Sequence, residues 1–253
     1  GTLALVTLYP FYQVLIISVS DTVAYAQHPL YVLPYVFDIT GYQTIFNDPN
    51  FYSALGVTLF VTVVGTMLNM LLSVSGAYVL SRKTLVGRNF FLGLILFTML
   101  FNGGVIPTYL VTKGIGLVNN IWVMVLPAAI STYYLIIMKN YFVSLPPSLL
   151  EAAKLDGAGE VRRFFAITFP IITPTIFYLL ITGVIANLQM YTDSLIFASG
   201  DPGAQTVVYF IWTFGIKRSM YGLAAAASTL LTVTIMLITI VQFRVSNRWV
   251  FEG

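Results

Sequence analysis

The stretch Glu151-Ala152-Ala153-Lys154-Leu155-Asp156-Gly157 is a short polar segment between two long apolar runs. Pro146, Pro147 and Ser148 precede it. Proline is tolerated in a first helical turn and serine caps helix N-termini, so a short helix is predicted to begin near Ser148. Glu151 falls in its first turn, where the helix dipole favours a carboxylate. Gly157 is placed to end the helix in a left-handed turn.

The pattern continues beyond this helix with fixed spacing. Nine residues separate Gly157 from Ile167, and Phe169 and Pro170 close the stretch. Residues 160–169 are predicted to form a second amphipathic segment, and Pro170 is predicted to start the next apolar run.

The composition indicates an all-α membrane protein. Of the 253 residues, 58 % are hydrophobic and only 8 % are charged, whereas soluble proteins carry about 25 % charged residues. The charges are clustered, which leaves the long uncharged stretches that membrane-spanning helices require. The chain has no cysteine, which excludes a disulfide framework, a thiolate zinc site and a cysteine nucleophile. No metal site is predicted.

Charged residues and turn signals divide the chain into six expected spans within a single membrane domain, 1–253. They cover about residues 2–20, 54–80, 90–111, 121–138, 171–190 and 222–243, and the central polar loop covers 139–170. Asn102-Gly103-Gly104 and Pro107 interrupt the third span. The first span starts inside an apolar run at Gly1, so a preceding cytoplasmic segment is expected.

Basic residues indicate the orientation. Six spans place both termini on one side of the membrane, together with the 82–89 turn and the central loop. That side carries nine basic residues: Arg82, Lys83, Arg88, Lys139, Lys154, Arg162, Arg163, Arg244 and Arg248. The other side carries three: Lys113, Lys217 and Arg218. Because basic residues concentrate on the cytoplasmic side, the Glu151 loop and both termini are predicted to be cytoplasmic.

The central stretch resembles the EAA loop of the membrane subunits of type I ABC importers. The matching positions are Glu151, Ala152, Ala153, Gly157, Ile167 and Pro170; Phe169 stands where the family usually has leucine. The resemblance implies the permease fold of this family, with a coupling helix that docks on a cytoplasmic ATPase. Asp156 lies within that helix. An ordinary cytoplasmic loop with a capped helix is the alternative.

A further resemblance points to carbohydrate uptake. Leu80-Ser81-Arg82-Lys83 with Gly87-Arg88, and the stretch Asn102 to Tyr109, are similar to the oligosaccharide and polysaccharide permeases of the maltose-type branch. The resemblance implies a second homologous permease subunit, two ATPase subunits that hold ATP and magnesium, and an extracytoplasmic sugar-binding protein. It also implies a bacterial cytoplasmic membrane and no cofactor in this chain.

Polar residues in or near the spans are candidates for the substrate pathway, because polar groups there are expensive and often functional. These candidates are Asn102, Asn187, Gln189, Tyr191 and Asp193, and Asn69 is a further amide within a span. Hydrogen bonding between helices is the alternative for each. The turn-rich segment Gly200, Asp201, Pro202 and Gly203 is expected to lie outside, where it either contacts the binding protein or merely connects two spans.

The sequence lacks the residues that two other classes of membrane protein, hydrolases and ion-coupled transporters, usually need. A membrane hydrolase needs a base and a nucleophile within reach of each other, yet the only histidine, His28, lies in a predicted external loop. An ion-coupled transporter is expected to carry ionisable residues inside its spans, and none is present. No phosphate-binding loop occurs either. The sequence therefore predicts a non-enzymatic subunit that imports a carbohydrate of oligosaccharide size. The alternative is an ABC importer subunit for a peptide, an amino acid or another small polar solute.

Overall fold

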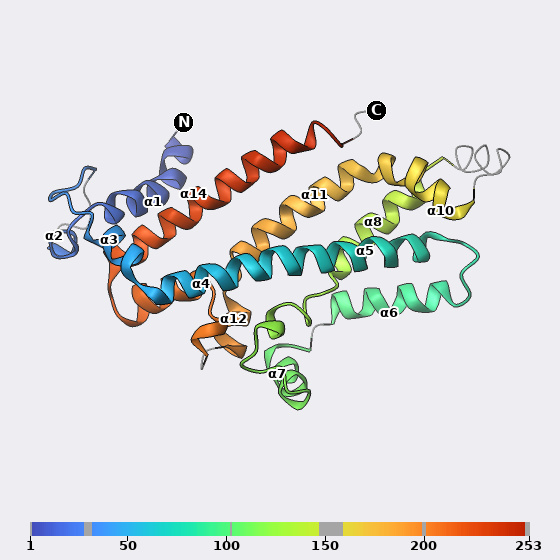
Figure 1. The fold of residues 1–253 in the computed structure, drawn as a ribbon, viewed down its shortest axis with the longest axis horizontal. Coiled ribbons are helices and arrows are strands. Elements are labelled where there is room, and N and C mark those ends of the chain that lie inside the picture. The colour runs from blue at the N-terminus through green and yellow to red at the C-terminus, as the bar shows by residue number, and fades with distance from the viewer. Residues whose placement is uncertain (1, 28–31, 102, 147–158, 199–200, 251–253) are drawn as a thin grey trace. The chain divides into compact units, whose positions relative to one another are not determined.

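The computed structural model describes residues 2–27, 32–101, 103–146, 159–198 and 201–250, and these residues are almost entirely helical. The only β feature among them is an isolated antiparallel bridge between Ser20 and Phe37. The α-helices, shown in Figure 1, are α1 (Thr2–Ser18), α2 (Thr22–Gln27), α3 (Thr40–Asn47), α4 (Pro49–Phe60), α5 (Thr66–Ser81), α6 (Arg88–Leu100), α7 (Val105–Gly114), α8 (Thr132–Ser144), α10 (Glu160–Arg163), α11 (Phe169–Leu188), α12 (Thr192–Phe197), α13 (Val207–Trp212) and α14 (Tyr221–Ser246). Two 3-10 helices (Ile121–Met124 and Pro202–Ala204) and three π-helices (Val61–Gly65, Phe164–Thr168 and Thr213–Lys217) complete the described elements.

Three continuous helices are long and apolar enough to cross a membrane: Pro49–Ser81, Val161–Leu188 and Tyr221–Ser246. They have 33, 28 and 26 residues, and about 20 residues span the hydrocarbon core. They contain the whole of the expected spans 54–80 and 222–243, and the expected span 171–190 except for its last two residues. Helices α6 and α7 pass the same test only as a pair bent by 115°. In the described part of the chain this gives three spans, or four with the bent pair, so the expected total of six stays a prediction.

The π-helices explain how two of the long helices remain continuous. Val61–Gly65 joins α4 to α5, and Phe164–Thr168 joins α10 to α11. Pro170, predicted to start the next apolar run, lies inside a longer helix, because helical turns already begin at Glu160. The backbone N–H of Phe169 bonds to the carbonyl of Phe164, five residues earlier. This wider turn lets the chain pass Pro170, which has no N–H to donate.

The expected span 121–138 also differs from the structure. Its first part is a short 3-10 helix, and α8 begins only at Thr132. Pro127 disfavours helical backbone at the residue before it, and the Ser131 hydroxyl caps α8 by accepting the Tyr134 N–H at 3.3 Å. Val125, at the start of the intervening segment, is 1 % exposed, whereas Leu126 and Ile130 are 46 % and 50 % exposed. Asn69 Nδ2 donates to the Ala128 carbonyl at 3.1 Å, which supplies a partner that irregular backbone at membrane depth requires.

The chain divides into two compact units. Unit 1 contains Gly1–Phe60, Val118–Val123 and Leu188–Ile238. Its core is formed by eight buried residues of α3, α4, α13 and α14: Ile45, Phe51, Ala54, Val207, Phe210, Leu223, Ala226 and Ala227. Phe51 and Phe210 meet edge to face at 5.6 Å. The Thr58 hydroxyl accepts the Val207 N–H at 2.9 Å and so ties α4 to the start of α13.

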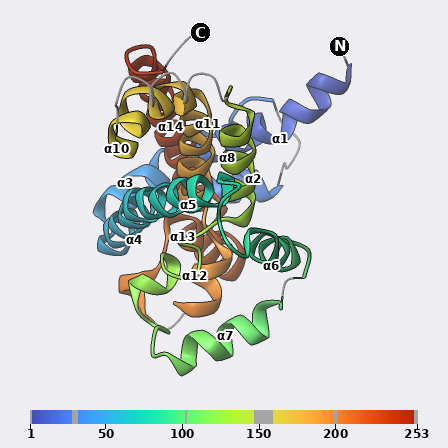
Figure 2. The same ribbon diagram turned by 90° about the vertical axis from the view of Figure 1, so that its right-hand side faces the viewer.

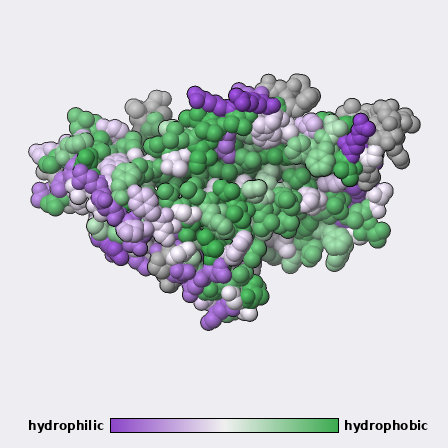
Figure 3. All heavy atoms as spheres, viewed as in Figure 1, coloured by the Kyte–Doolittle hydropathy of each residue, from purple (hydrophilic) through white to green (hydrophobic). Residues whose placement is uncertain are grey.

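Unit 2 contains Val61–Leu117, Met124–Asn187 and Thr239–Gly253. Its core comes from α5, α8 and α11: Ala77, Leu80, Leu135, Met138, Phe142, Ile172 and Leu179. Both ribbon views show α5 running beside α8 (Figures 1 and 2). No residue of α6 is buried although most are apolar, and Figure 3 shows hydrophobic residues over the visible faces of α5 and α6. Such faces suit lipid or another membrane helix, not water.

Candidate functional site

A small polar cavity lies inside unit 2 between the first turns of α5, the start of α8 and the last turns of α11. Its volume is about 180 Å³. Polar side chains of Thr66, Asn69, Ser131, Tyr134 and Asn187 line it. A cavity with several hydroxyls and amides, and one aromatic ring, can hydrogen-bond a polyhydroxylated solute.

Asn187 is the predicted pathway residue that the structure places in this cavity. Its Nδ2 donates to the Thr66 hydroxyl at 3.0 Å, so one amide hydrogen already links α11 to α5. Thr66 is buried, whereas Asn187 is partly exposed. An asparagine carboxamide has two donors and an acceptor oxygen, and this is the one side-chain bond that the described structure gives Asn187. The group therefore retains capacity for a solute.

Asn69 lines the same cavity but has a structural role. Besides its bond to the Ala128 carbonyl, its Oδ1 accepts the Ser73 hydroxyl at 3.3 Å. For this residue the alternative of hydrogen bonding within the protein is the better interpretation.

The other predicted pathway residues are not among the described residues that line this cavity. Helix α11 ends at Leu188. Gln189, Tyr191 and Asp193 follow it in the chain and belong to unit 1. Gln189 is exposed, and Tyr191 lines a separate groove with Trp212. Asp193 lies in the first turn of α12, outside the long helices, and burial raises the pKa of its carboxyl. Asn102 lies outside the described residues.

The predicted binding-protein loop is tied to α12. Asp201 Oδ1 accepts the Gly203 N–H at 2.9 Å, which stabilises the turn where the short helix Pro202–Ala204 forms. The buried Ser194 hydroxyl accepts the Thr206 N–H at 3.1 Å, and the Thr206 hydroxyl donates to the Met190 carbonyl at 2.7 Å. The described part of this loop is therefore held firmly to its flanking helices. Gly200 lies outside the described residues.

The predicted coupling helix lies outside the described residues, and the structure describes only its flanks. Glu151, Ala152, Ala153, Asp156 and Gly157 lie outside the described residues, and Ile167 and Pro170 lie within the continuous helix that follows. Beside that flank is an open hollow lined by Gly159, Val161, Arg162, Phe165 and Ala166. Val161 is 72 % and Phe165 is 64 % exposed. These apolar side chains form a surface on which a partner could pack.

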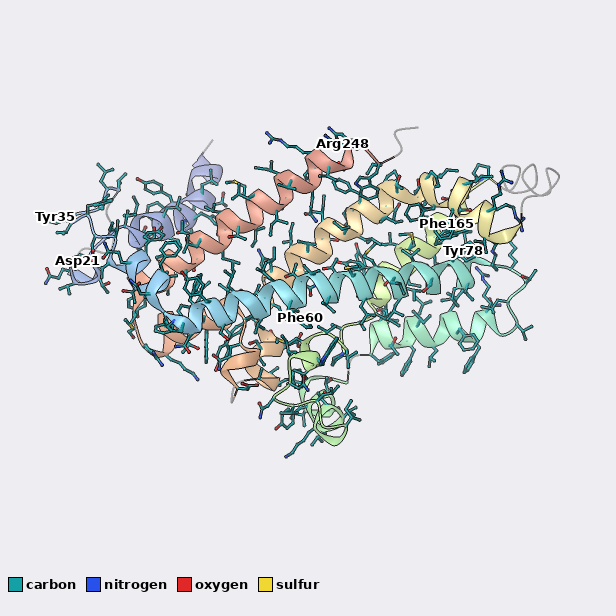
Figure 4. All side chains as sticks on the ribbon, in the orientation of Figure 1. Asp21, Tyr35, Phe60, Tyr78, Phe165 and Arg248 are labelled. Carbon is teal, nitrogen blue, oxygen red and sulfur yellow. The ribbon has the colours of Figure 1, made fainter. Side chains whose placement is uncertain are left out.

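An aromatic cluster anchors the same flank to α5 and α8. The Tyr78 ring meets Phe164 at 4.9 Å and Phe142 at 5.5 Å, both edge to face. The Arg82 guanidinium lies 4.5 Å from the centre of the Tyr78 ring. Figure 4 shows Tyr78 and Phe165 at the same end of these helices. A movement of residues 159–165 would therefore be passed to α5 through Tyr78 and to α8 through Phe142.

Comparison with known proteins decides the family. Residues 50–251 match the family described as "Binding-protein-dependent transport system inner membrane component". The chain belongs to this family. It is thus an integral membrane transport component, as its apolar helices require, and the family is not a catalytic one.

Two individual relatives of this transport component come from Bacillus subtilis strain 168. It is 39 % identical over 176 residues to protein LplC of Bacillus subtilis strain 168, a match that covers 70 % of this chain and 60 % of the relative. It is 42 % identical over 173 residues to the polygalacturonan/rhamnogalacturonan transport system permease protein YtcP of the same organism, covering 68 % and 60 %. These matches span about three fifths of the length of both relatives.

A solved structure matches nearly the whole transport component. It is that of a bacterial ABC transporter involved in the import of the acidic polysaccharide alginate, with a TM-score of 0.85 and 26 % identity. The match covers 96 % of this chain and 92 % of that chain. The all-α importer permease fold expected from the sequence is confirmed.

Several residues that shape the sites were not identified from the sequence. Thr66 and Ser131 were read only as parts of apolar runs, and Arg82 was used only for its charge and for the resemblance to carbohydrate permeases. The partners that give Thr66 and Arg82 a role, Asn187 and the Tyr78 ring, could not be assigned by spacing alone. For Thr66 the partner lies 121 residues away.

Proposed function

We propose that this chain is one membrane subunit of an ATP-driven importer that carries a carbohydrate of oligosaccharide size. The proposal rests on the membership of this chain in a family of binding-protein-dependent transport components. The printed activities of relatives support the substrate class: one is a permease for polygalacturonan and rhamnogalacturonan, and the matching structure imports alginate. A third relative, AraQ of Halalkalibacterium halodurans, is named for arabinooligosaccharides and is 24 % identical over 237 residues.

The cavity in unit 2 is the proposed point of contact with the sugar. Asn187 offers amide groups to sugar hydroxyls, and Tyr134 offers a ring to the apolar face of a sugar. Tyr191, Asp193, Gln189 and Asn102 remain proposed pathway residues. An interior of hydroxyls and amides without formal charge suits a polyhydroxylated solute better than a charged peptide or amino acid terminus, which needs an opposite charge.

The partners in this proposal follow from the family and from the central loop. An extracytoplasmic binding protein delivers the sugar, with Asp201 and Gly203 as proposed contacts. A second permease subunit completes the pathway. Two ATPase subunits hydrolyse ATP in the cytoplasm, where the nine-to-three distribution of basic residues places the Glu151 loop and both termini. The chain itself is not proposed to bind or hydrolyse ATP.

Reconstitution in vesicles tests the proposal. The chain is purified with its co-expressed subunits and mixed with the binding protein encoded beside it, after that protein has been loaded from panels of oligosaccharides, peptides and amino acids. We expect ATP hydrolysis to rise, and labelled solute to accumulate, only with an oligosaccharide. Stimulation by a peptide or an amino acid without any effect of sugars would contradict the proposed substrate class. Stimulation by no loaded binding protein would contradict the importer function.

A further inference from the structure

A second, larger hollow lies in unit 1, and the proposed sugar pathway does not use it. It is a groove of about 740 Å³ between α1, the segment 208–216 and the first turns of α14. Val14, Ile17, Ile211 and Ile216 form apolar walls. Gly215 and Ala224 meet so closely at its base that a Cβ added to Gly215 would lie 3.0 Å from the Ala224 Cβ. Small residues at this point let the segment 208–216 approach α14 closely.

Two cations follow the segment 208–216 that lines this groove, and aromatic rings lie beside them. Lys217 Nζ lies 4.6 Å from the ring centre of Trp212, which lines the groove. The Arg218 guanidinium lies 4.5 Å from the ring centre of Phe214. Both cations are exposed side chains at the end of the π-helix Thr213–Lys217. Tyr191 and Tyr221 also line the groove.

The groove runs from the start of α14 into the apolar length of this membrane helix. Helix α14 begins at Tyr221, and Ser228 at the other end of the lining is seven residues further on. Seven residues of helix span about 10 Å. Tyrosine and tryptophan rings favour the membrane–water interface, and long basic side chains reach toward it. The cations therefore lie at headgroup level and the aliphatic walls at acyl-chain level.

We propose that this groove binds an anionic phospholipid, with an acyl chain against the aliphatic walls and the phosphate beside Lys217 and Arg218. The charges complement a headgroup of one negative charge. The walls have few hydrogen-bonding groups: the Ser228 hydroxyl donates to the Ala224 carbonyl of its own helix at 2.8 Å. A sugar would leave its hydroxyls unpaired against such walls. A lipid would hold α1 and the 208–216 segment to α14.

Photolabelling with two lipids tests this binding. The full chain with its co-purified subunits is reconstituted in phosphatidylcholine vesicles that contain a trace of phosphatidylglycerol or phosphatidylcholine with a photoactivatable acyl chain. Labelled peptides are identified by mass spectrometry. We expect residues 208–228 to be labelled about five-fold or more strongly by the phosphatidylglycerol probe, because each cation near the surface contributes about a five-fold preference.

Variants separate the headgroup from the acyl chain. Lys217→Gln with Arg218→Gln should make labelling by the two probes equal, whereas Lys113→Gln, at the end of α7, should leave the preference unchanged. Ser228→Phe, which fills the inner end of the groove, should lower labelling by both probes. Equal labelling of the parent chain by the two lipids would overturn the proposal. So would the absence of label in residues 208–228 while α6 is labelled, because protein would then cover the groove.

Discussion

Asn187 is the side chain on which the proposed sugar contact depends. It lines the cavity of unit 2 and bonds to Thr66 at 3.0 Å. Removing one hydrogen bond to the sugar should weaken the binding of the sugar by about 0.5–1.5 kcal/mol. We therefore expect Asn187→Ala to reduce the sugar transported per ATP hydrolysed by roughly two- to ten-fold, measured in vesicles with saturating loaded binding protein.

The bond between Asn187 and Thr66 needs its own control. Thr66→Val removes the acceptor, keeps the shape of the side chain and leaves the Asn187 amide in the cavity. This variant should melt at a lower temperature than the parent but transport sugar with unchanged coupling to ATP. If both variants lowered coupling equally, Asn187 would serve only to join α5 and α11.

Asp193 makes stability depend on pH. Burial raises the pKa of this carboxyl above its ordinary 3.8, so the folded chain binds the proton more tightly than the unfolded chain. Ionisation then opposes folding, and this destabilisation grows as pH rises from 3.8 through the raised pKa. We expect Asp193→Asn to raise the melting temperature more at pH 8 than at pH 4, followed by protein fluorescence in detergent. An increment that is constant with pH would show that burial of this carboxyl does not control stability.

The sequence identified the right kinds of residue in the pathway but not their grouping. Amides in an apolar run are visible in the sequence, and Asn187 was found in this way. That Asn187 lines the cavity of unit 2 whereas Tyr191 lines the groove of unit 1 was not visible, because hydropathy does not show which residues line a hollow. The role of Asn69 depends on an irregular segment near Ala128 that hydropathy reads as part of a span.

At the scale of elements, glycines set the approach of α3 to α14. A Cβ on Gly41 would lie 3.1 Å from the Gly222 carbonyl oxygen and 3.4 Å from the Ala226 Cβ. Gly41→Val adds further methyl groups to this contact and should destabilise the protein by about 1–3 kcal/mol. Gly56→Val in α4 is the matched control, since a Cβ there meets nothing within 4 Å. Thermal melts of the two variants in detergent provide the comparison, and equal losses would contradict close packing at Gly41.

Helices that cross the apolar region without interruption were predictable, and interrupted ones were not. Hydropathy alone located the helices 49–81, 161–188 and 221–246 to within a few residues at most ends. It merged α6 with α7 and the 3-10 helix at Ile121 with α8, because an apolar residue scores the same in a helix and in irregular backbone. The π-turn that carries the chain past Pro170 has no residue signature of its own.

The orientation of the whole chain in the membrane can be measured by labelling its loops from one side. The nine-to-three distribution of basic residues predicts that the central loop is cytoplasmic and that residues near 199–204 face outward. The chain has no cysteine, so single cysteines at Ser148 and Ser199 can be labelled without a background. In intact cells an impermeant maleimide should modify Ser199→Cys and leave Ser148→Cys unmodified until the cells are opened. The reverse pattern would invert the proposed topology.

The central claim is that this membrane subunit couples a partner's ATP hydrolysis to sugar import through the loop around Glu151. Gly157 is predicted to adopt a left-handed conformation at the end of the coupling helix, which a β-branched residue resists. The decisive measurement is sugar-stimulated ATP hydrolysis by the complex that carries Gly157→Val, beside Gly93→Val, whose added Cβ meets nothing within 4 Å. We predict that Gly157→Val abolishes the stimulation or releases the ATPase, while Gly93→Val retains the parental rate. An assembled Gly157→Val complex that hydrolyses ATP and imports sugar at the parental rate would contradict the account.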